Sequence, residues 1–198
     1  MLKYLFIVVL SLSGLSAHAQ YAPENEAGLL AARAGEWQTA WDIWKPLADA
    51  GDARAQSNIG VMYDNGDVVA EDDVEAVRWF MLSAEGGFPP GQFNLANMYK
   101  NGAGVAQNLN LAHRWYQAAA RQGHPQAQMA LMQALYFGRG VSQDNAKAYM
   151  WLVIAAEGGF ELAVENIADF ESRIRKAAVA RGRAMALKCI PIGLENCP

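Results

Sequence analysis

The 198-residue sequence contains only two cysteines and three histidines, and both cysteines, Cys189 and Cys197, lie at its C-terminal end. Metal-binding side chains are therefore too few for a zinc-type cluster, and no His-Glu-x-x-His motif is present. Because seven residues separate the cysteines, they do not form the Cys-x-x-Cys arrangement of a redox couple. We predict a structural disulfide, with free thiols as the alternative, and no metal and no cofactor.

Positive charge is also scarce. The chain has 16 Lys and Arg residues against 20 Asp and Glu, a net charge of −4. Since affinity for nucleic acid depends on basic groups that neutralise phosphates, we expect no nucleic-acid partner. The main basic group lies near the C-terminus and is predicted to be a solvated cap. Its members are Arg173, Arg175, Lys176, Arg181 and Arg183.

No apolar run reaches the roughly 20 residues that cross a bilayer as a helix. Residues 1–19 combine Lys3, a mostly apolar stretch at 4–12 and the small-x-small sequence Ala17-His18-Ala19. They are predicted to be a signal peptide cleaved after Ala19, with a retained membrane anchor as the alternative. We therefore expect a periplasmic or secreted protein without stable membrane insertion after cleavage.

What the sequence does contain is a repeat. Trp79, Trp115 and Trp151 stand 36 residues apart, and glycine, valine and alanine residues around them return at the same interval. A fixed period of 20 to 50 residues is typical of a solenoid built from one supersecondary unit. Flanking alanines at helical spacing favour packing of the tryptophans in the core over a ligand-stacking role.

Within the first full unit, Asn65-Gly66 predicts the end of one helix, and Asp72 predicts the N-cap of the next. Glu75, three residues on, completes a capping-box pattern, and Val69 is expected to pack back into the core. Because one helix pair cannot bury its own apolar face, stability must come from stacked neighbours. The predicted organisation is a signal peptide at 1–19, a capping helix pair at 24–52, repeats at 53–88, 89–124 and 125–160, and capping helices with a disulfide tail at 161–198.

The second unit carries the segment 95–105 (LANMYKNGAGV), followed by 112–116 (AHRWY). This pattern resembles the Sel1-like repeat (SLR) family, a branch of the tetratricopeptide repeat superfamily, and residues 59–63 and 138–141 match it too. Two positions depart from the pattern: Val68 replaces a loop glycine, and Leu135 replaces a tyrosine.

The resemblance implies an all-α, right-handed superhelical solenoid of antiparallel helix pairs. It also implies a non-enzymatic protein–protein interaction module, an adaptor, assembly factor or regulatory scaffold, in the bacterial cell envelope. Two alternatives stay open. One is a purely structural spacer, and the other is penicillin-binding or β-lactamase-like activity, as in the similar Helicobacter cysteine-rich proteins. Against the second, no unit contains a cysteine, and residues 20–198 contain no Ser-x-x-Lys.

In tetratricopeptide-like superhelices the first helix of each pair lines the concave face. The resemblance therefore predicts a partner-binding row of amides and apolar side chains that suits a peptide or helix of another protein. The alternative is that Phe93 and Met129 pack between units, so that only polar members are exposed. The predicted row is Ser57, Val61, Asp64, Phe93, Asn97, Lys100, Met129, Gln133 and Tyr136.

Overall fold

The computed structural model describes residues 22–197, and within this range it contains ten α-helices, two short 3₁₀ helices and no β-strand. The predicted signal peptide at 1–19 lies outside the described residues. The helices are α2 (Ala22–Arg33), α3 (Trp37–Asp49), α4 (Ala53–Asn65), α5 (Asp73–Glu85), α6 (Pro89–Asn101), α7 (Leu109–Arg121), α8 (Pro125–Phe137), α9 (Asn145–Glu157), α10 (Glu161–Arg173), α11 (Lys176–Cys189), η1 (Ile190–Ile192) and η2 (Leu194–Asn196).

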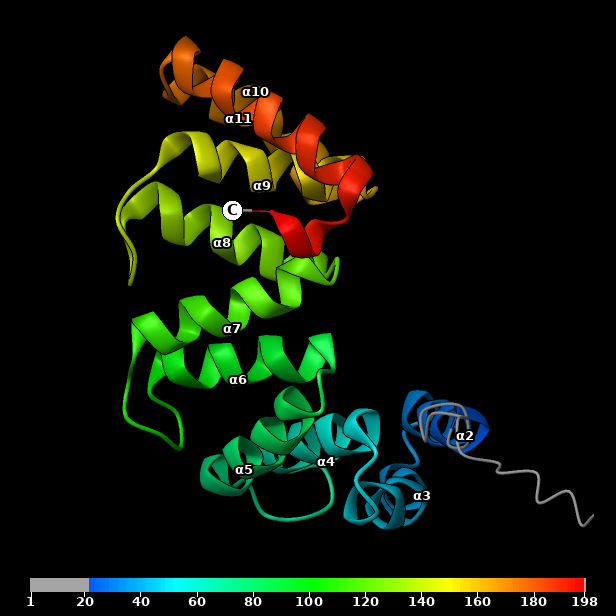
Figure 1. Ribbon diagram of the computed structural model, residues 1–198. Coiled ribbons are helices and arrows are strands. Elements are labelled where there is room, and N and C mark those ends of the chain that lie inside the picture. The colour runs from blue at the N-terminus through cyan, green and yellow to red at the C-terminus, as the bar shows by residue number, and fades with distance from the viewer. Residues whose placement is uncertain (1–21, 198) are drawn as a thin grey trace, which may run out of the picture.

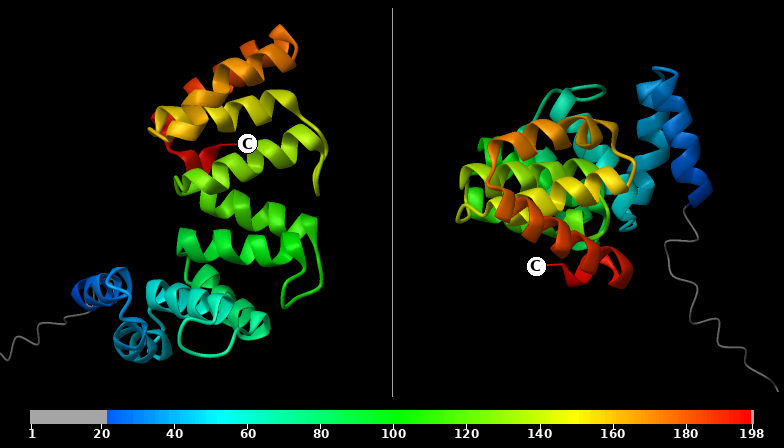
Figure 2. Two further views of the ribbon diagram at one scale, coloured as in Figure 1. Left: turned by 180° about the vertical axis from the view of Figure 1, so that it is seen from behind. Right: turned by 90° about the horizontal axis from the view of Figure 1, so that it is seen from above.

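The helices form antiparallel pairs that stack on one another in chain order (Figure 1). At one end of the stack, the α2–α3 pair projects to one side, and at the other end α10 and α11 cover α9 (Figure 2). The all-α repeat solenoid predicted from the sequence is therefore confirmed.

Helix ends follow local side-chain chemistry. Asp72, Asn108 and Asp144 accept hydrogen bonds from backbone N–H groups in the first turns of α5, α7 and α9. These bonds satisfy donors that the helix itself leaves unpaired. The first helices of the full units end at glycines with left-handed backbone, Gly66, Gly102 and Gly138.

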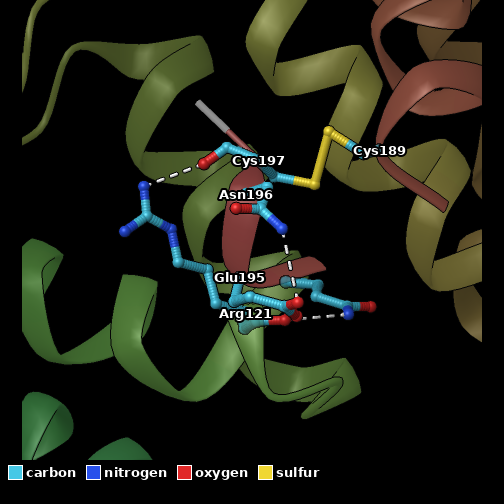
Figure 3. The surroundings of a disulfide bond; sticks show 7 residues. Arg121, Cys189, Glu195, Asn196 and Cys197 are labelled. Atoms are coloured by element: carbon cyan, nitrogen blue, oxygen red, sulfur yellow. Dashed lines mark hydrogen bonds between the residues drawn. A yellow bond between two sulfur atoms is a disulfide. The ribbon is translucent and has the colours of Figure 1, made fainter. Parts of the chain in front are cut away.

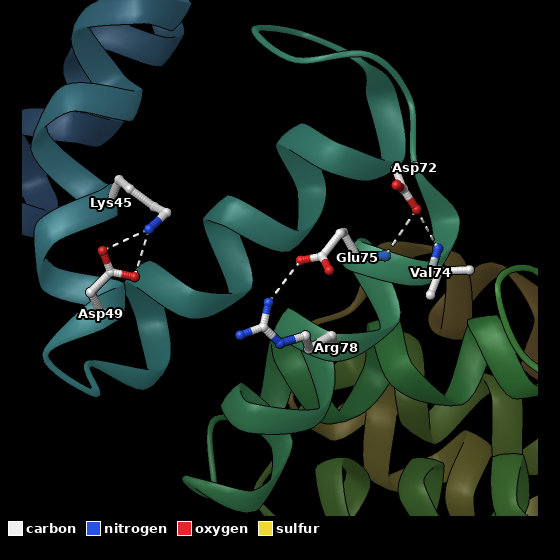
Figure 4. A network of polar contacts seen from close by, with 6 residues as sticks. All are labelled: Lys45, Asp49, Asp72, Val74, Glu75 and Arg78. Atoms are coloured by element: carbon white, nitrogen blue, oxygen red, sulfur yellow. Dashed lines mark hydrogen bonds and ion pairs between the residues drawn. The ribbon is translucent and has the colours of Figure 1, made fainter.

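The capping box predicted at Asp72 forms only in part. The Asp72 carboxylate accepts from the N–H groups of Val74 and Glu75, both at 3.0 Å. The Glu75 side chain does not reach back, because the Asp72 N–H already donates to the Tyr63 carbonyl at 2.9 Å. Glu75 instead pairs with Arg78 at 3.0 Å (Figure 4). The Tyr63 carbonyl of α4 thus accepts the Asp72 N–H that the Glu75 side chain would accept in a capping box.

The core contains the tryptophans to different degrees. Trp79 and Trp151 are buried, as predicted, whereas Trp115 is half-buried. Helix α9 is covered on several sides, and every residue from 149 to 155 is buried. Ala112, Ala120 and Ala148 are buried in the same cluster as Trp151, and such small side chains allow neighbouring helices to approach closely. The apolar run at 149–156 is therefore the centre of the stack's largest core cluster.

Trp79 also joins the N-terminal pair to the first full unit. Lys45 Nζ, from α3, lies 5.3 Å from the centre of the Trp79 ring, and Arg78 Cζ lies 5.6 Å from it. Each cation is held by a carboxylate on its own helix, Lys45 by Asp49 at 2.6 Å and Arg78 by Glu75 (Figure 4). Two cations, each paired with a carboxylate, therefore lie near the Trp79 ring where the N-terminal pair meets the first full unit.

Three buried glutamines repeat the 36-residue period, in addition to the residues predicted to repeat. The side-chain amides of Gln56, Gln92 and Gln128 each donate at 3.2 Å to a carbonyl in the last turn of the preceding unit's second helix. Because the donor belongs to one unit and the acceptor to the unit before it, this bond fixes the joint between units. The acceptors are the carbonyls of Ala48, Ala84 and Ala120.

The loop valines of the three units differ in their packing. Val105 and Val141 are half-buried and pack against apolar clusters that their own units share with neighbouring units. In the first unit the expectation for Val69 was wrong, because Val68 takes this role and packs against the cluster that includes the N-terminal pair.

Glycine explains this difference. At Gly104, whose φ is +62°, a Cβ atom would lie 2.1 Å from the Asp73 carbonyl oxygen, and at Gly140 it would lie 2.4 Å from the Leu109 oxygen. The loops of the second and third units therefore lie against the start of the previous unit's second helix. Val68 stands in the equivalent place in the first unit and carries a side chain, so this backbone approach is not available to it.

A disulfide between Cys189 and Cys197, with Cα atoms 5.4 Å apart, closes the C-terminal tail (Figure 3). The tail folds back onto α7, where Arg121 donates to the Cys197 carbonyl at 2.8 Å. Both cysteines are buried. The disulfide thus joins the end of α11 to a tail that is hydrogen-bonded to α7, a helix more than one unit away along the stack.

Candidate functional site

The first helices of successive pairs form one layer, and a crevice of about 280 Å³ lies between α2, α4 and α6. Leu29, Val61 and Phe88 contribute apolar surface to this crevice, and Asn58 and Asn94 contribute amides. The guanidinium of Arg54 lies 5.7 Å from the centre of the Phe88 ring. The crevice therefore combines apolar walls with groups that can hydrogen-bond a peptide backbone.

The structure divides the predicted row by burial. Ser57 and Met129 are only 3% and 7% exposed. Ser57 still contributes to the crevice, whereas Met129 belongs to the core. For Met129 the structure thus corrects the predicted surface role, because neighbouring helices cover its side chain. The half-buried members are Val61, Phe93, Asn97 and Tyr136, and the exposed members are Asp64, Lys100 and Gln133.

Both aromatic members of the row support the packing between units. The centre of the Phe93 ring lies 4.9 Å from that of His124 and 5.7 Å from that of Tyr116. Tyr136 packs against Phe170 of α10 at 4.9 Å. Replacing Phe93 or Tyr136 would therefore disturb the stack as well as the surface, so neither position gives a clean test of binding.

Asn97 is similarly engaged. Its Oδ1 accepts from the Tyr116 hydroxyl at 2.6 Å. Burial raises the pKa of Tyr116 to about 12, so the phenol stays protonated and remains a donor over the physiological range. Asn97 thus offers a partner only the part of its amide that Tyr116 does not use.

Asn58 and Asn94 were missed in the predicted row. They are half-buried and stand 36 residues apart, so the repeat itself contained the signal. In the third unit the same register holds Ala130. Amide spacing along the period, in addition to helix register, would have identified them.

Charge is uneven along this layer. Near the first loop, burial, followed by Asp73 and Glu71, raises the pKa of Asp64. The members of the row in the second and third units have no acidic neighbour of this kind in the sequence, because no Asp or Glu occurs between residues 86 and 143. Lys100 and Gln133 line a second crevice in that region.

Between residues 22 and 197 no group of three or more His, Cys, Asp or Glu side chains is arranged to hold a metal ion. Two serine hydroxyls are engaged in backbone bonds: Ser83 donates to the Ala53 carbonyl at 2.5 Å, and Ser172 donates to that of Asp169 at 2.7 Å. The helices in this part of the chain are all too short or too polar to span a membrane.

The Sel1 repeat family model matches residues 53–88, 89–124 and 125–160, more than half of the chain. A crystal structure of a Sel1 repeat protein from Oxalobacter formigenes is similar, with a TM-score of 0.71 and 29% sequence identity over 78% of this chain and 63% of that one. A protective antigen present in uropathogenic Escherichia coli strains, which displays an SLR fold, has a TM-score of 0.75 and 28% identity over 83% of this chain and 36% of the antigen. This chain therefore spans less than two thirds of either protein. No curated protein matches its sequence.

Proposed function

Since this chain belongs to the Sel1 repeat family, whose repeats are generally non-catalytic protein–protein interaction modules, we propose that it is an adaptor that holds an extended segment of another protein. The crevice between α2, α4 and α6 is the main contact surface in this proposal.

The observation that carries the proposal is the repeated pair of amides at Asn58 and Asn94. They lie in the same register of adjacent units and line one crevice together with Val61 and Phe88. An extended peptide presents a backbone N–H and C=O at every residue, and amides can bond both. The apolar walls would then receive alternate side chains of the same segment.

The bacterial cell envelope is the proposed location. The sequence of residues 1–19 supports export, and the pairing of Cys189 with Cys197 suits an oxidising compartment. The measurement is the mass of the native protein from separated cell fractions, with and without alkylation of free thiols. A chain that begins at Gln20, carries no alkylated cysteine and is recovered from the periplasm or the medium agrees with the proposal. A full-length chain with two alkylated thiols contradicts it.

The contact surface can be tested with a photo-crosslinking amino acid introduced at single positions in the source cell. Val61 and Asn94 lie in the crevice, and Arg114 is an exposed residue on a second helix, α7. We expect a discrete crosslinked partner from Val61 and Asn94 and none from Arg114. Crosslinks at all three positions, or at Arg114 alone, would contradict the assignment of the crevice.

The spacer alternative makes a different prediction in the same experiment. A structural element would contact its assembly through its ends, where Val164 of α10 is 55% exposed. Crosslinks from Val164 together with silence from Val61 and Asn94 would favour a spacer over an adaptor. Penicillin-binding activity would appear as nitrocefin turnover by the purified protein above a denatured control, and we expect none.

A further inference from the structure

Acidic side chains are absent from the middle of this otherwise acidic chain. Residues 86–143 contain no Asp or Glu, and their basic residues are Lys100, Arg114, Arg121 and Arg139. By contrast, residues 22–85 contain 13 acidic and 4 basic residues. The second repeat and the start of the third therefore form a locally positive zone next to an acidic N-terminal region.

A crevice of about 350 Å³ lies inside this zone, between the α6–α7 pair and α8. Three basic side chains from different elements line it: Lys100 near the end of α6, His113 on α7, and Arg139 in the loop after α8. Ala112 and Ala130 supply part of its apolar wall. The stacking of the second unit on the third thus brings together groups up to 39 residues apart in the sequence.

The basic groups of this crevice lack counterions in the part of the chain that the structure describes. Among residues 22–197, neither Lys100 nor Arg139 forms an ion pair with a carboxylate, although Arg139 also lies over the Phe137 ring, 4.9 Å from its centre. The Nδ1 atom of His113 is buried and has no hydrogen-bond partner in the same part of the chain. The crevice is therefore lined by two cations without a carboxylate partner and by a histidine whose Nδ1 atom is not hydrogen-bonded.

The size and surroundings of the crevice favour a single small anion over a polyanion. Its volume suits one or two side chains, and its alanine walls suit the methylene groups of an acidic side chain. An acidic polysaccharide or a nucleic acid would place further negative charges along the neighbouring acidic region, where they would be repelled.

We propose that this crevice is a subsite for a carboxylate side chain, an Asp or Glu of the partner segment, bound by Lys100 and Arg139. This inference rests on the proposed adaptor function and assigns an acidic character to the partner. Arg139 can bind both carboxylate oxygens, and Lys100 provides a second cation.

The probes are two capped pentapeptides that differ only in their central residue, Glu in one and Gln in the other. Binding is followed by amide chemical shifts around the crevice and by titration of the His113 imidazole. Burial, and to a smaller extent Lys147, lowers the pKa of His113 in the free protein. The charged and titratable groups that face it are Lys100, Tyr116, Arg139 and Lys147. A carboxylate bound nearby would favour the charged imidazole, so the pKa of His113 should rise with the Glu peptide and not with the Gln peptide.

Lys100→Gln combined with Arg139→Gln should weaken binding of the Glu peptide by about two- to thirtyfold, the range expected for the loss of two exposed charge pairs. Arg114→Gln, on the exposed side of α7, is the matched control and should leave binding unchanged. Unchanged thermal midpoints for both variants exclude unfolding as the cause.

Equal binding of the Glu and Gln peptides, no binding of either, or equal binding by the double variant would overturn the carboxylate subsite. Tighter binding of inorganic phosphate, or binding of heparin that depends on Arg114, would replace it with a phosphate site or with general charge attraction. The adaptor function is judged separately by the crosslinks at Val61 and Asn94. If those persist in the Lys100/Arg139 double variant with unchanged partner affinity, the adaptor stands and the subsite fails.

Discussion

The imidazole of His124 stacks on the ring of Phe93, with ring centres 4.9 Å apart and planes inclined by 28°. At the same time its Nδ1 atom accepts the Ala127 N–H at 3.3 Å and so caps the start of α8. One side chain therefore joins the second unit to the first turn of the third. The capping bond needs the neutral ring, because Nδ1 can accept a hydrogen bond only when it is unprotonated.

The free energy of unfolding should therefore fall in mild acid, in part through His124. Burial lowers the pKa of His124 below its ordinary value of 6.5, so the unfolded chain binds a proton more readily than the folded one. The stabilisation is present above about pH 6.5 and is lost as the pH falls through the lowered pKa.

The measurement is the urea midpoint of unfolding between pH 8 and pH 5. His124→Asn keeps a capping acceptor without a titrating group, and it should show a shallower loss. The remaining loss of stability in this variant is expected from His113, whose pKa is lowered in the same direction. Identical pH profiles for both proteins would refute the role of His124.

The glutamine joints should each contribute measurably to stability. Gln128→Leu keeps the volume of the side chain and removes the bond to the Ala120 carbonyl, and we expect a loss of about 1 kcal/mol in the free energy of unfolding. The matched control is Gln143→Leu, because Gln143 is exposed and donates to the Tyr136 carbonyl within its own unit. That variant should change stability by less than about 0.5 kcal/mol. Equal losses in the two urea titrations would show that the buried bond between units stabilises the fold no more than the exposed bond within a unit.

Glycine at residue 104 should matter for contact as well as for backbone conformation. Gly104→Ala and Gly123→Ala both place a side chain on left-handed backbone, at φ of +62° and +87°. The shared conformational cost is about 1–2 kcal/mol. At Gly123 no atom lies within 4 Å of the new Cβ, whereas at Gly104 the Asp73 carbonyl lies 2.1 Å away. Gly104→Ala should therefore cost about 1–3 kcal/mol more, measured by urea denaturation. If the two alanine variants lose equal stability, the close contact between Gly104 and the Asp73 carbonyl of α5 is refuted.

The disulfide should stabilise the folded chain by restricting the unfolded tail. For the nine-residue loop closed by Cys189 and Cys197, the chain-entropy relation gives about 2.5 kcal/mol. Replacing both cysteines by alanine should remove this amount. Reductant should produce the same loss in the natural protein and no further loss in the variant. A natural protein whose unfolding is insensitive to reductant would argue against the disulfide.

Local bonds explain why much of the fold was predictable. The N-caps at Asp72, Asn108 and Asp144 and the left-handed glycine at Gly66 depend on residues within a few positions of one another. By contrast, the failure of Glu75 to complete a capping box depended on the Tyr63 carbonyl, which only the folded pair brings to the Asp72 N–H. Short-range rules identified the helix ends, and contacts within the pair decided which bonds formed there.

The candidate surface was less predictable, because helix register does not specify which neighbour covers a side chain. Met129 and Gln133 both belong to the first helix of the third unit, yet Met129 is buried and Gln133 is exposed. The basic crevice was harder still, since it joins Lys100 to Arg139 across two units. Its one visible sign in the sequence was the absence of Asp and Glu from residue 86 to residue 143.

The glutamine joint also has a consequence for how such a chain can lengthen. The segment 89–124 carries the donor Gln92 at its entry and the acceptor carbonyl of Ala120 at its exit. An in-frame duplication of those 36 codons would therefore insert a second copy of the unit. The Gln92 of the second copy could donate to the Ala120 carbonyl of the first, and the joints to the flanking units would be unchanged. At the position where a fourth donor would stand, the chain has Val164, which is exposed and has no side-chain amide. Tandem copying of a unit thus carries its own joint with it, whereas α10 itself begins without the donor that would form a fourth joint.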